Sequence, residues 1–168
     1  MNIRDALLEV HSKAQATMIA NFVGDDQRLF DELMGLMLSP VYRISQRAAW
    51  PVRFCVERNS KLLKPYFGEL IKQLEPGEAP VAVRRNVLRL MQFAEIPKQY
   101  AGRIFDACYK LVDDPKETVA IRVFALTVAA KLAEPSPELL DELRLLAAKY
   151  PQAATSGFRS RVKRVLGI

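Results

Sequence analysis

The sequence predicts an all-α protein made of stacked helix pairs, and three observations support this. An apolar residue followed by arginine recurs four times, each time after a break that contains Pro or Gly. Each such pair opens an apolar stripe with helical spacing, and a second family of apolar stripes lies between them. A repeat of this length is typical of stacked helical units. The arginines are 41, 38 and 37 residues apart, in the pairs Tyr42-Arg43, Val83-Arg84, Ile121-Arg122 and Phe158-Arg159.

The N-terminal segment is expected to form one capping helix over residues 3–22. Apolar residues recur there at helical spacing, and Gly24 with the two aspartates that follow it ends the pattern. We expect a single helical-repeat domain over residues 1–168, with 1–24 as the cap. Its four repeats are expected at about 25–60, 64–95, 97–133 and 136–166.

The first helix of each repeat, which we name the A helix, carries apolar residues at i, i+3, i+4 and i+7. The words FDEL (30–33), FGEL (67–70) and LDEL (140–143) show that these helices are related. The stripes are Phe30, Leu33, Met34, Met37; Phe67, Leu70, Ile71, Leu74; Ala101, Ile104, Phe105, Cys108; and the weaker Leu140, Leu143, Leu146.

The second helix, which we name the B helix, carries apolar residues at i, i+4, i+7 and i+8. Three copies agree: Val83, Val87, Leu90, Met91; Ile121, Ala125, Val128, Ala129; and Phe158, Val162, Val165, Leu166. The B helix expected at about 41–58 fits less well, because Pro51 lies inside it and a proline removes one backbone hydrogen bond. The last stripe ends the sequence with no following repeat, so it is either an incomplete cap or a surface for self-association.

From these residues the pattern resembles HEAT repeats over about residues 28–166. The best matches are IFDACYKLVDDPKETVAIRVFALTVAAKLA (104–133) and VAVRRNVLRL (81–90). The interval lies at or just under the roughly 40–47 residues usual for this class. The turns at Ser39-Pro40 and YPQAATSG (150–157) depart from the family's acidic turn. The resemblance implies a right-handed α-α superhelix whose B helices line the concave side, and a role in binding proteins or, less often, nucleic acid.

Charge is separated by helix type. The B segments 39–64, 79–96, 119–134 and 154–168 carry +5, +2, +1 and +4, whereas the A segments with their turns carry −6 in total and the chain +6. If the B helices share one surface, that surface is basic and attracts an acidic protein segment or a phosphate backbone. The partner-binding candidates are Arg43, Arg47, Trp50, Arg53, Arg85, Arg89, Arg159, Arg161 and Arg164.

Structural roles compete with binding for several residues of the B helices. Arg84 is expected to pair with Glu75 or Glu78, and Arg122 with Asp113 or Asp114, because an arginine in this position of a HEAT-like repeat commonly pairs with an acidic turn. Arg43 and Arg159 have no acidic residue in their own turns and are better candidates for ligand contact. Trp50 is either partly buried core or an aromatic anchor for a peptide or a base.

No catalytic, metal-binding or cofactor-binding motif is present. P-loop, dinucleotide-binding glycine loop, nucleophile elbow and paired-carboxylate patterns are all missing, and His11 is the only histidine. Cys55 and Cys108 lie in or beside apolar stripes and are expected to be core thiols. The sequence therefore gives no reason to propose an enzyme, a metal or a cofactor.

The leading hypothesis is a protein-interaction module whose basic B-helix face holds an acidic or extended partner. The second is a nucleic-acid binder, by analogy with the HEAT-like DNA glycosylases. The third is a regulatory subunit of a larger assembly that self-associates through its C-terminal helix. The sequence carries no signal peptide and no apolar run long enough to span a membrane, so we expect a cytoplasmic protein with no membrane partner.

Overall fold

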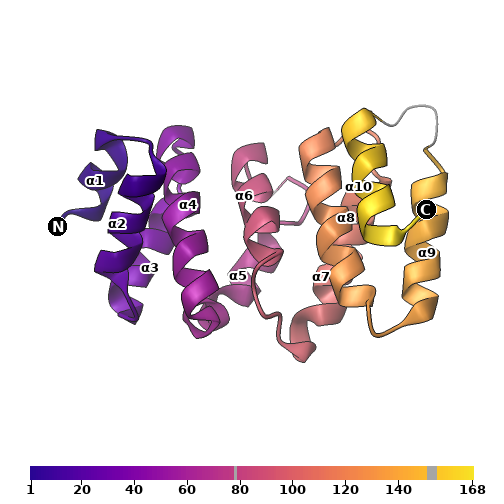
Figure 1. Cartoon of the computed structure of the whole chain (residues 1–168), viewed down its shortest axis with the longest axis horizontal. Helices are drawn as coiled ribbons and strands as arrows, with labels where there is room; N and C mark the ends of the chain where they lie inside the picture. The colour runs from indigo at the N-terminus through magenta and orange to yellow at the C-terminus, as the bar shows by residue number, and fades with distance from the viewer. Residues whose placement is uncertain (78, 151–154) are drawn as a thin grey trace. The chain divides into compact units, whose positions relative to one another are not determined.

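All regular structure in the computed structural model is helical (Figure 1). The structure describes residues 1–77, 79–150 and 155–168. Within these residues there are ten α-helices, one 3-10 helix and no β-strand, so the predicted all-α class is confirmed.

The chain divides into two compact units, residues 1–95 and 96–168, and each is described by itself. The expectation of one continuous domain over residues 1–168 stays a prediction. The first unit contains α1 (Ile3–Glu9), α2 (Lys13–Val23), α3 (Gln27–Met37), α4 (Tyr42–Arg58), η1 (Ser60–Tyr66), α5 (Phe67–Lys72) and α6 (Val81–Met91). The second contains α7 (Lys98–Asp113), α8 (Val119–Ala133), α9 (Pro137–Ala148) and α10 (Ser156–Leu166).

The B helices are the central elements of both units. In the first unit α4 packs against α1, α2, α3, η1 and α6, and in the second α8 packs against α7, α9 and α10. The A and B helices alternate as expected: α3 and α4, α5 and α6, α7 and α8, α9 and α10. Helix α4 continues through Pro51, which is buried in its middle.

The predicted apolar stripes form the cores. All four stripe residues of α3 are fully buried, and so are nearly all those of α5, α6, α7 and α8. On α10, Phe158 and Leu166 are buried, while Val162 and Val165 are half-buried. The C-terminal stripe, expected to be uncovered, therefore packs largely against α8 and α9.

The N-terminal segment is two helices, and the expected single helix over residues 3–22 is wrong in this respect. Val10 is extended, with φ −137° and ψ 140°, which ends α1. Ser12 then caps α2, because its hydroxyl accepts a hydrogen bond of 3.1 Å from the backbone N–H of Gln15. The Gln15 side chain donates back to the carbonyl of Ala6 at 2.8 Å and so fastens α2 against α1.

The second A helix begins as a 3-10 helix, η1, and only its last six residues are α-helical. Asn59 caps η1 by accepting from the N–H of Lys61 at 3.2 Å. Pro65 lies in η1 and has no N–H with which to make an α-helical bond, which favours the tighter winding there.

Arg84 and Arg122, in the second and third apolar–arginine pairs, are buried. A guanidinium nitrogen of Arg84 donates to the backbone carbonyl of Glu75 at 3.3 Å, and Nε of Arg122 donates to that of Val112 at 3.0 Å. Val112 lies in the last turn of α7, and Glu75 lies in the turn that follows α5, where carbonyl groups lack helical partners. Both arginines thus bond to backbone carbonyls of the preceding A helix and its turn, and the expected pairing with turn carboxylates stays a prediction. Glu78, named as an alternative partner, lies outside the described residues.

A compact polar cluster surrounds Arg122. Its guanidinium lies 4.6 Å from the ring centroid of Tyr150 and 4.8 Å from that of Phe158. The carboxylate of Asp113 accepts from Lys149 Nζ at 2.8 Å and from the Tyr150 hydroxyl at 2.7 Å. These bonds, that of Lys149 above all, hold the pKa of Asp113 below its ordinary value.

Candidate functional site

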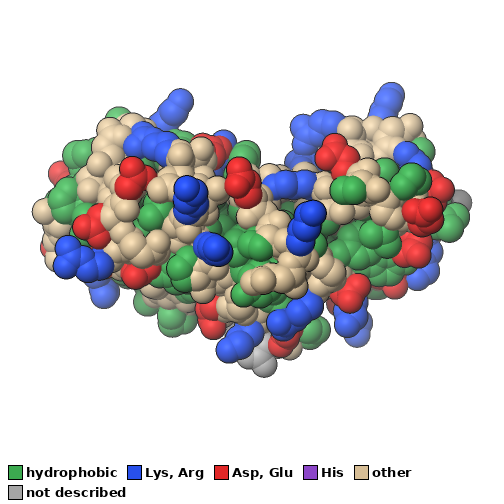
Figure 2. Space-filling model, turned by 90° about the horizontal axis from the view of Figure 1, so that it is seen from below, with side chains coloured by type: hydrophobic (Ala, Val, Ile, Leu, Met, Phe, Trp, Pro, Cys, Tyr) green, Lys and Arg blue, Asp and Glu red, His purple; other side chains and the backbone are tan. Residues whose placement is uncertain are grey.

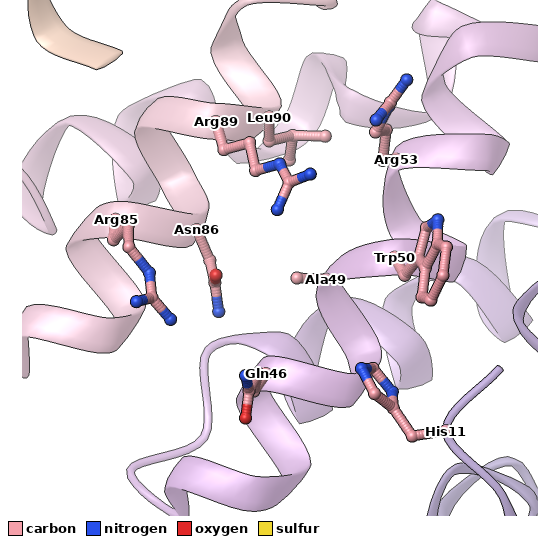
Figure 3. Close-up of a pocket in the computed structure, with 9 residues that line it drawn as sticks. All are labelled: His11, Gln46, Ala49, Trp50, Arg53, Arg85, Asn86, Arg89 and Leu90. Atoms are coloured by element: carbon pink, nitrogen blue, oxygen red, sulfur yellow. The ribbon is translucent and has the colours of Figure 1, made fainter. Parts of the chain in front are cut away.

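A pocket of about 310 Å³ lies between the two B helices of the first unit (Figure 3). Helices α4 and α6 supply its walls, and the turn between α1 and α2 closes one side. The lining residues are His11, Gln46, Ala49, Trp50, Arg53, Arg85, Asn86, Arg89 and Leu90.

Helical spacing explains why these residues face one space. Those from α4 occupy i, i+3, i+4 and i+7, and those from α6 occupy i, i+1, i+4 and i+5, so each set shares one side of its helix. Ala49 is the small residue of the α4 set. Figure 3 shows its methyl group between Trp50 on one wall and Asn86 on the other.

The two walls are fastened by a buried polar link. Asn86 on α6 donates through Nδ2 to the carbonyl and to the hydroxyl of Ser45 on α4, both at 3.3 Å. The Ser45 hydroxyl in turn donates to the carbonyl of Met37 at 2.6 Å. Ser45 is fully buried and Asn86 nearly so, so this chain of bonds fixes α6 against α4 at the pocket.

The lining residues carry positive charge and no carboxylate. The positive charge of Arg53 is paired with Glu57, because its Nε lies 2.8 Å from Oε1 of that residue. Its guanidinium also lies 4.0 Å from the centroid of the Phe93 ring. Arg85 and Arg89 make no hydrogen bond or ion pair with any residue that the structure describes. The pocket therefore holds two arginines whose charge has no partner within the described chain.

An aromatic wall stands opposite these two arginines (Figure 3). Trp50 is half-buried, and the His11 ring meets it edge-on with centroids 5.6 Å apart. The ring of Phe54 lies 6.2 Å from that of Trp50 on the same helix. Trp50 thus packs against its neighbours and also lines the pocket, and its role as an aromatic anchor stays a prediction.

Four of the nine candidate residues are brought together in this pocket: Trp50, Arg53, Arg85 and Arg89. Arg47 is engaged elsewhere, because it donates to the carbonyls of Leu7 and Leu8 at 2.9 Å each and so caps the end of α1. Arg43 is exposed on α4 and makes no hydrogen bond or ion pair with a described residue.

The remaining three candidates lie on α10 in the second unit and are not part of the pocket. Arg161 donates to the hydroxyl of Thr127 on α8 at 2.6 Å. Burial lowers the pKa of its guanidinium, and the charge of Arg164 adds to this. Arg159 and Arg164 are exposed.

Three polar residues that line the pocket were not among the candidates: His11, Gln46 and Asn86. Gln46 was visible as a polar residue on the α4 stripe, and Asn86 as the neighbour of Arg85. His11 gave no such signal, because it reaches the pocket only through the break between α1 and α2.

The face shown in Figure 2 carries Lys and Arg side chains interspersed with Asp and Glu, with hydrophobic side chains between them. A cluster of arginines without a carboxylate among its lining residues is found at the pocket. The wider basic face stays a prediction.

Cys55 and Cys108 are free and buried, as expected for core thiols. Burial raises the pKa of the Cys55 thiol to about 11, and it also raises the pKa of Cys108. A thiol with a raised pKa is a poor nucleophile at neutral pH. Among the described residues no group of His, Cys, Asp and Glu side chains is placed to hold a metal ion.

A family model described as a HEAT repeat domain matches residues 3–167. No curated protein and no solved structure matches the chain. In the described part of the chain, no helix has the length and apolar character needed to span a membrane.

Proposed function

The chain belongs to the HEAT repeat domain family, and from that premise we propose that it is a non-enzymatic binding module. HEAT repeats commonly act as scaffolds for protein interactions. In this proposal the B-helix surface of α4 and α6 holds an acidic or extended segment of a protein partner.

The observation that carries the proposal is the pocket between α4 and α6. It combines two arginines that have no acidic partner among the described residues with a half-buried tryptophan. Arginine and tryptophan are the residue types that most often dominate binding energy at protein interfaces. An acidic segment would supply the negative charge that the lining residues lack.

Trp50 makes the test direct, because it is the only tryptophan of the chain and it lines the pocket. We expect the acidic peptide acetyl-EEGEGEE-amide to change its fluorescence in a saturable way at low salt. The double variant Arg85→Glu, Arg89→Glu is expected to lose this binding. Arg103→Glu, in the second unit, is the matched control, since Arg103 is exposed and makes no bond to a described residue. Equal binding by both variants and the unchanged protein would rule the surface out.

Nucleic-acid binding is the second candidate, favoured by an aromatic ring beside three arginines. Bases stack on exposed aromatic rings, and arginines bind phosphates. Titration with single-stranded and duplex oligonucleotides tests it. Binding that falls steeply with salt, and that is lost in the Arg85→Glu, Arg89→Glu variant, would favour this function. No binding at low salt would exclude it.

A further inference from the structure

Two arginines of the pocket have no partner among the described residues, and they stand next to each other. Arg85 and Arg89 are four residues apart on α6, so their side chains project from the same side of the helix. Like charges at this spacing destabilise a helix. A negative ligand between them would reverse that repulsion.

The charge of the pocket selects the kind of anion. Arg53 is already balanced by Glu57, which leaves the charges of Arg85 and Arg89. A carboxylate carries one negative charge and would balance one of them. A phosphate ester carries about −1.5 to −2 at neutral pH, with three acceptor oxygens, so it matches both arginines.

The geometry of the guanidinium N–H donors also favours a phosphate. Guanidinium groups bind phosphate through paired, nearly parallel N–H donors, which a single ammonium group cannot do. Gln46 adds an amide to the same space and is exposed. An anion bound there would meet side chains from both α4 and α6.

The rest of the pocket fits the side chain that carries the phosphate. Ala49, Trp50 and Leu90 form an apolar part of the wall. A volume of about 310 Å³ is at the lower end of the range usual for small-molecule sites, about 300–1,000 Å³. It suits one modified side chain better than a dinucleotide or another large cofactor.

A nucleic-acid strand is less well matched, because its affinity comes from a row of phosphate contacts. Several arginines of the B helices are already engaged inside their own units. Arg47 binds the end of α1, Arg84 and Arg122 bind backbone carbonyls, and Arg161 binds Thr127. Among the described B-helix residues of the first unit, this leaves Arg85 and Arg89 together in the pocket and Arg43 apart from them on α4.

We propose that the pocket recognises a phosphorylated side chain in an extended segment of a protein partner. Arg85 and Arg89 bind the phosphate, and Trp50 packs against the side chain that carries it. This rests on the proposed function, in which the same surface holds an acidic or extended segment, and it names the group that is recognised.

The test compares peptides acetyl-EEGXGEE-amide in which X is phosphoserine, phosphotyrosine, serine, tyrosine or glutamate. Binding to the full chain is followed by Trp50 fluorescence and by calorimetry. At least one phosphopeptide is expected to bind about tenfold more tightly than its unmodified form and more tightly than the glutamate peptide. About tenfold is what one net charge-assisted contact provides.

The matched variants are Arg85→Gln with Arg89→Gln, and Arg103→Gln as control. The double variant is expected to abolish the preference for phosphate, whereas the control keeps it. Both changes replace side chains that are at least partly exposed, and circular dichroism checks that the fold is retained. Arg85→Lys with Arg89→Lys keeps the charge but loses the paired donors, so it is expected to keep only part of the preference.

The possible failures are distinguishable. If the glutamate peptide binds as tightly as both phosphopeptides, the phosphate inference is wrong and the acidic-segment function stands. If no peptide binds, both are wrong. If a single-stranded oligonucleotide binds more tightly than every peptide and depends on Arg85 and Arg89, the inference is wrong and the nucleic-acid function is favoured.

Discussion

Arginine has different roles at equivalent positions of the repeats. Arg84 and Arg122 are buried against the end of the preceding A helix, whereas Arg43 and Arg159 are exposed. The sequence predicted this division from the acidic turns near the first two. It could not predict the acceptors, because a backbone carbonyl at a helix end is present in every helical repeat and leaves no mark in the sequence.

Arg122 is expected to be the most stabilising of these four. Arg122→Ala would leave the Val112 carbonyl without its donor and would remove the contacts with Tyr150 and Phe158. We expect a loss of about 2–3 kcal/mol in the free energy of unfolding, measured by urea denaturation. Arg103→Ala, at an exposed position, is expected to change stability by less than about 0.5 kcal/mol. Similar values for the two variants would contradict the structural role.

Asp113 predicts a pH dependence of stability. Hydrogen bonds from Lys149 and Tyr150 lower its pKa below the ordinary 3.8. The folded state therefore favours the charged carboxylate. This contribution is fully present above the ordinary pKa and is lost as pH falls through the lower folded value. The Asp113→Asn variant is expected to be less stable than the unchanged protein at pH 6, by an amount that shrinks as pH approaches 3. Urea midpoints measured at both pH values check this, and a constant difference would contradict it.

Helices α4 and α6 are joined by a buried polar contact beside the pocket. Asn86 and Ser45 link them, and the arginines of α6 flank Asn86 in sequence. The sequence identified both helices and the Arg and Trp residues on them. It missed the pairing of Asn86 with Ser45 because these residues lie 41 positions apart and each belongs to an otherwise ordinary helix.

A double-mutant cycle measures this link. Asn86→Ala and Ser45→Ala are each expected to destabilise the protein by about 1–2 kcal/mol. Their effects are expected to be non-additive, with a coupling of about 0.5–1 kcal/mol in urea denaturation. Asn86→Ala is also expected to weaken peptide binding, because α6 loses its register against α4. A coupling indistinguishable from zero would show that the contact does not join the helices.

The break between the two N-terminal helices was missed although its signal is local in the sequence. The apolar spacing over residues 3–22 is continuous, so periodicity predicts one helix. The break depends on Ser12, whose side chain begins a new helix three residues before Gln15. A serine followed at this spacing by glutamine is a capping signal. This signal could have predicted that a new helix begins after Ser12. Without this break His11 would not meet Trp50.

At the level of the whole molecule, each unit has its own core and its own central B helix. The sequence predicted the helix pairs and their order correctly, because apolar stripes report burial residue by residue. The division into units was not predicted, since the repeat pattern runs through residues 95 and 96 without a change of composition. Both the candidate pocket and all its lining residues fall in the first unit.

A fragment of residues 1–95 is therefore expected to fold alone and to keep the peptide binding of the full chain. Circular dichroism and the Trp50 fluorescence titration check the two expectations separately. A fragment of residues 1–80, which lacks α6 and its arginines, is the matched control and is expected to lose binding. A fragment 1–95 that stays unfolded would show that the first unit depends on the second.

Each unit contains one buried thiol, so the opening of the two units can be measured separately. Cys55 lies on α4 and Cys108 on α7, so each unit contains one cysteine that solvent reaches only when its surroundings open. The rate at which a thiol reagent modifies each cysteine in the native protein therefore measures how often that unit opens. A ligand in the pocket would slow the modification of Cys55 directly, and any slowing at Cys108 would measure how strongly the opening of one unit is linked to that of the other.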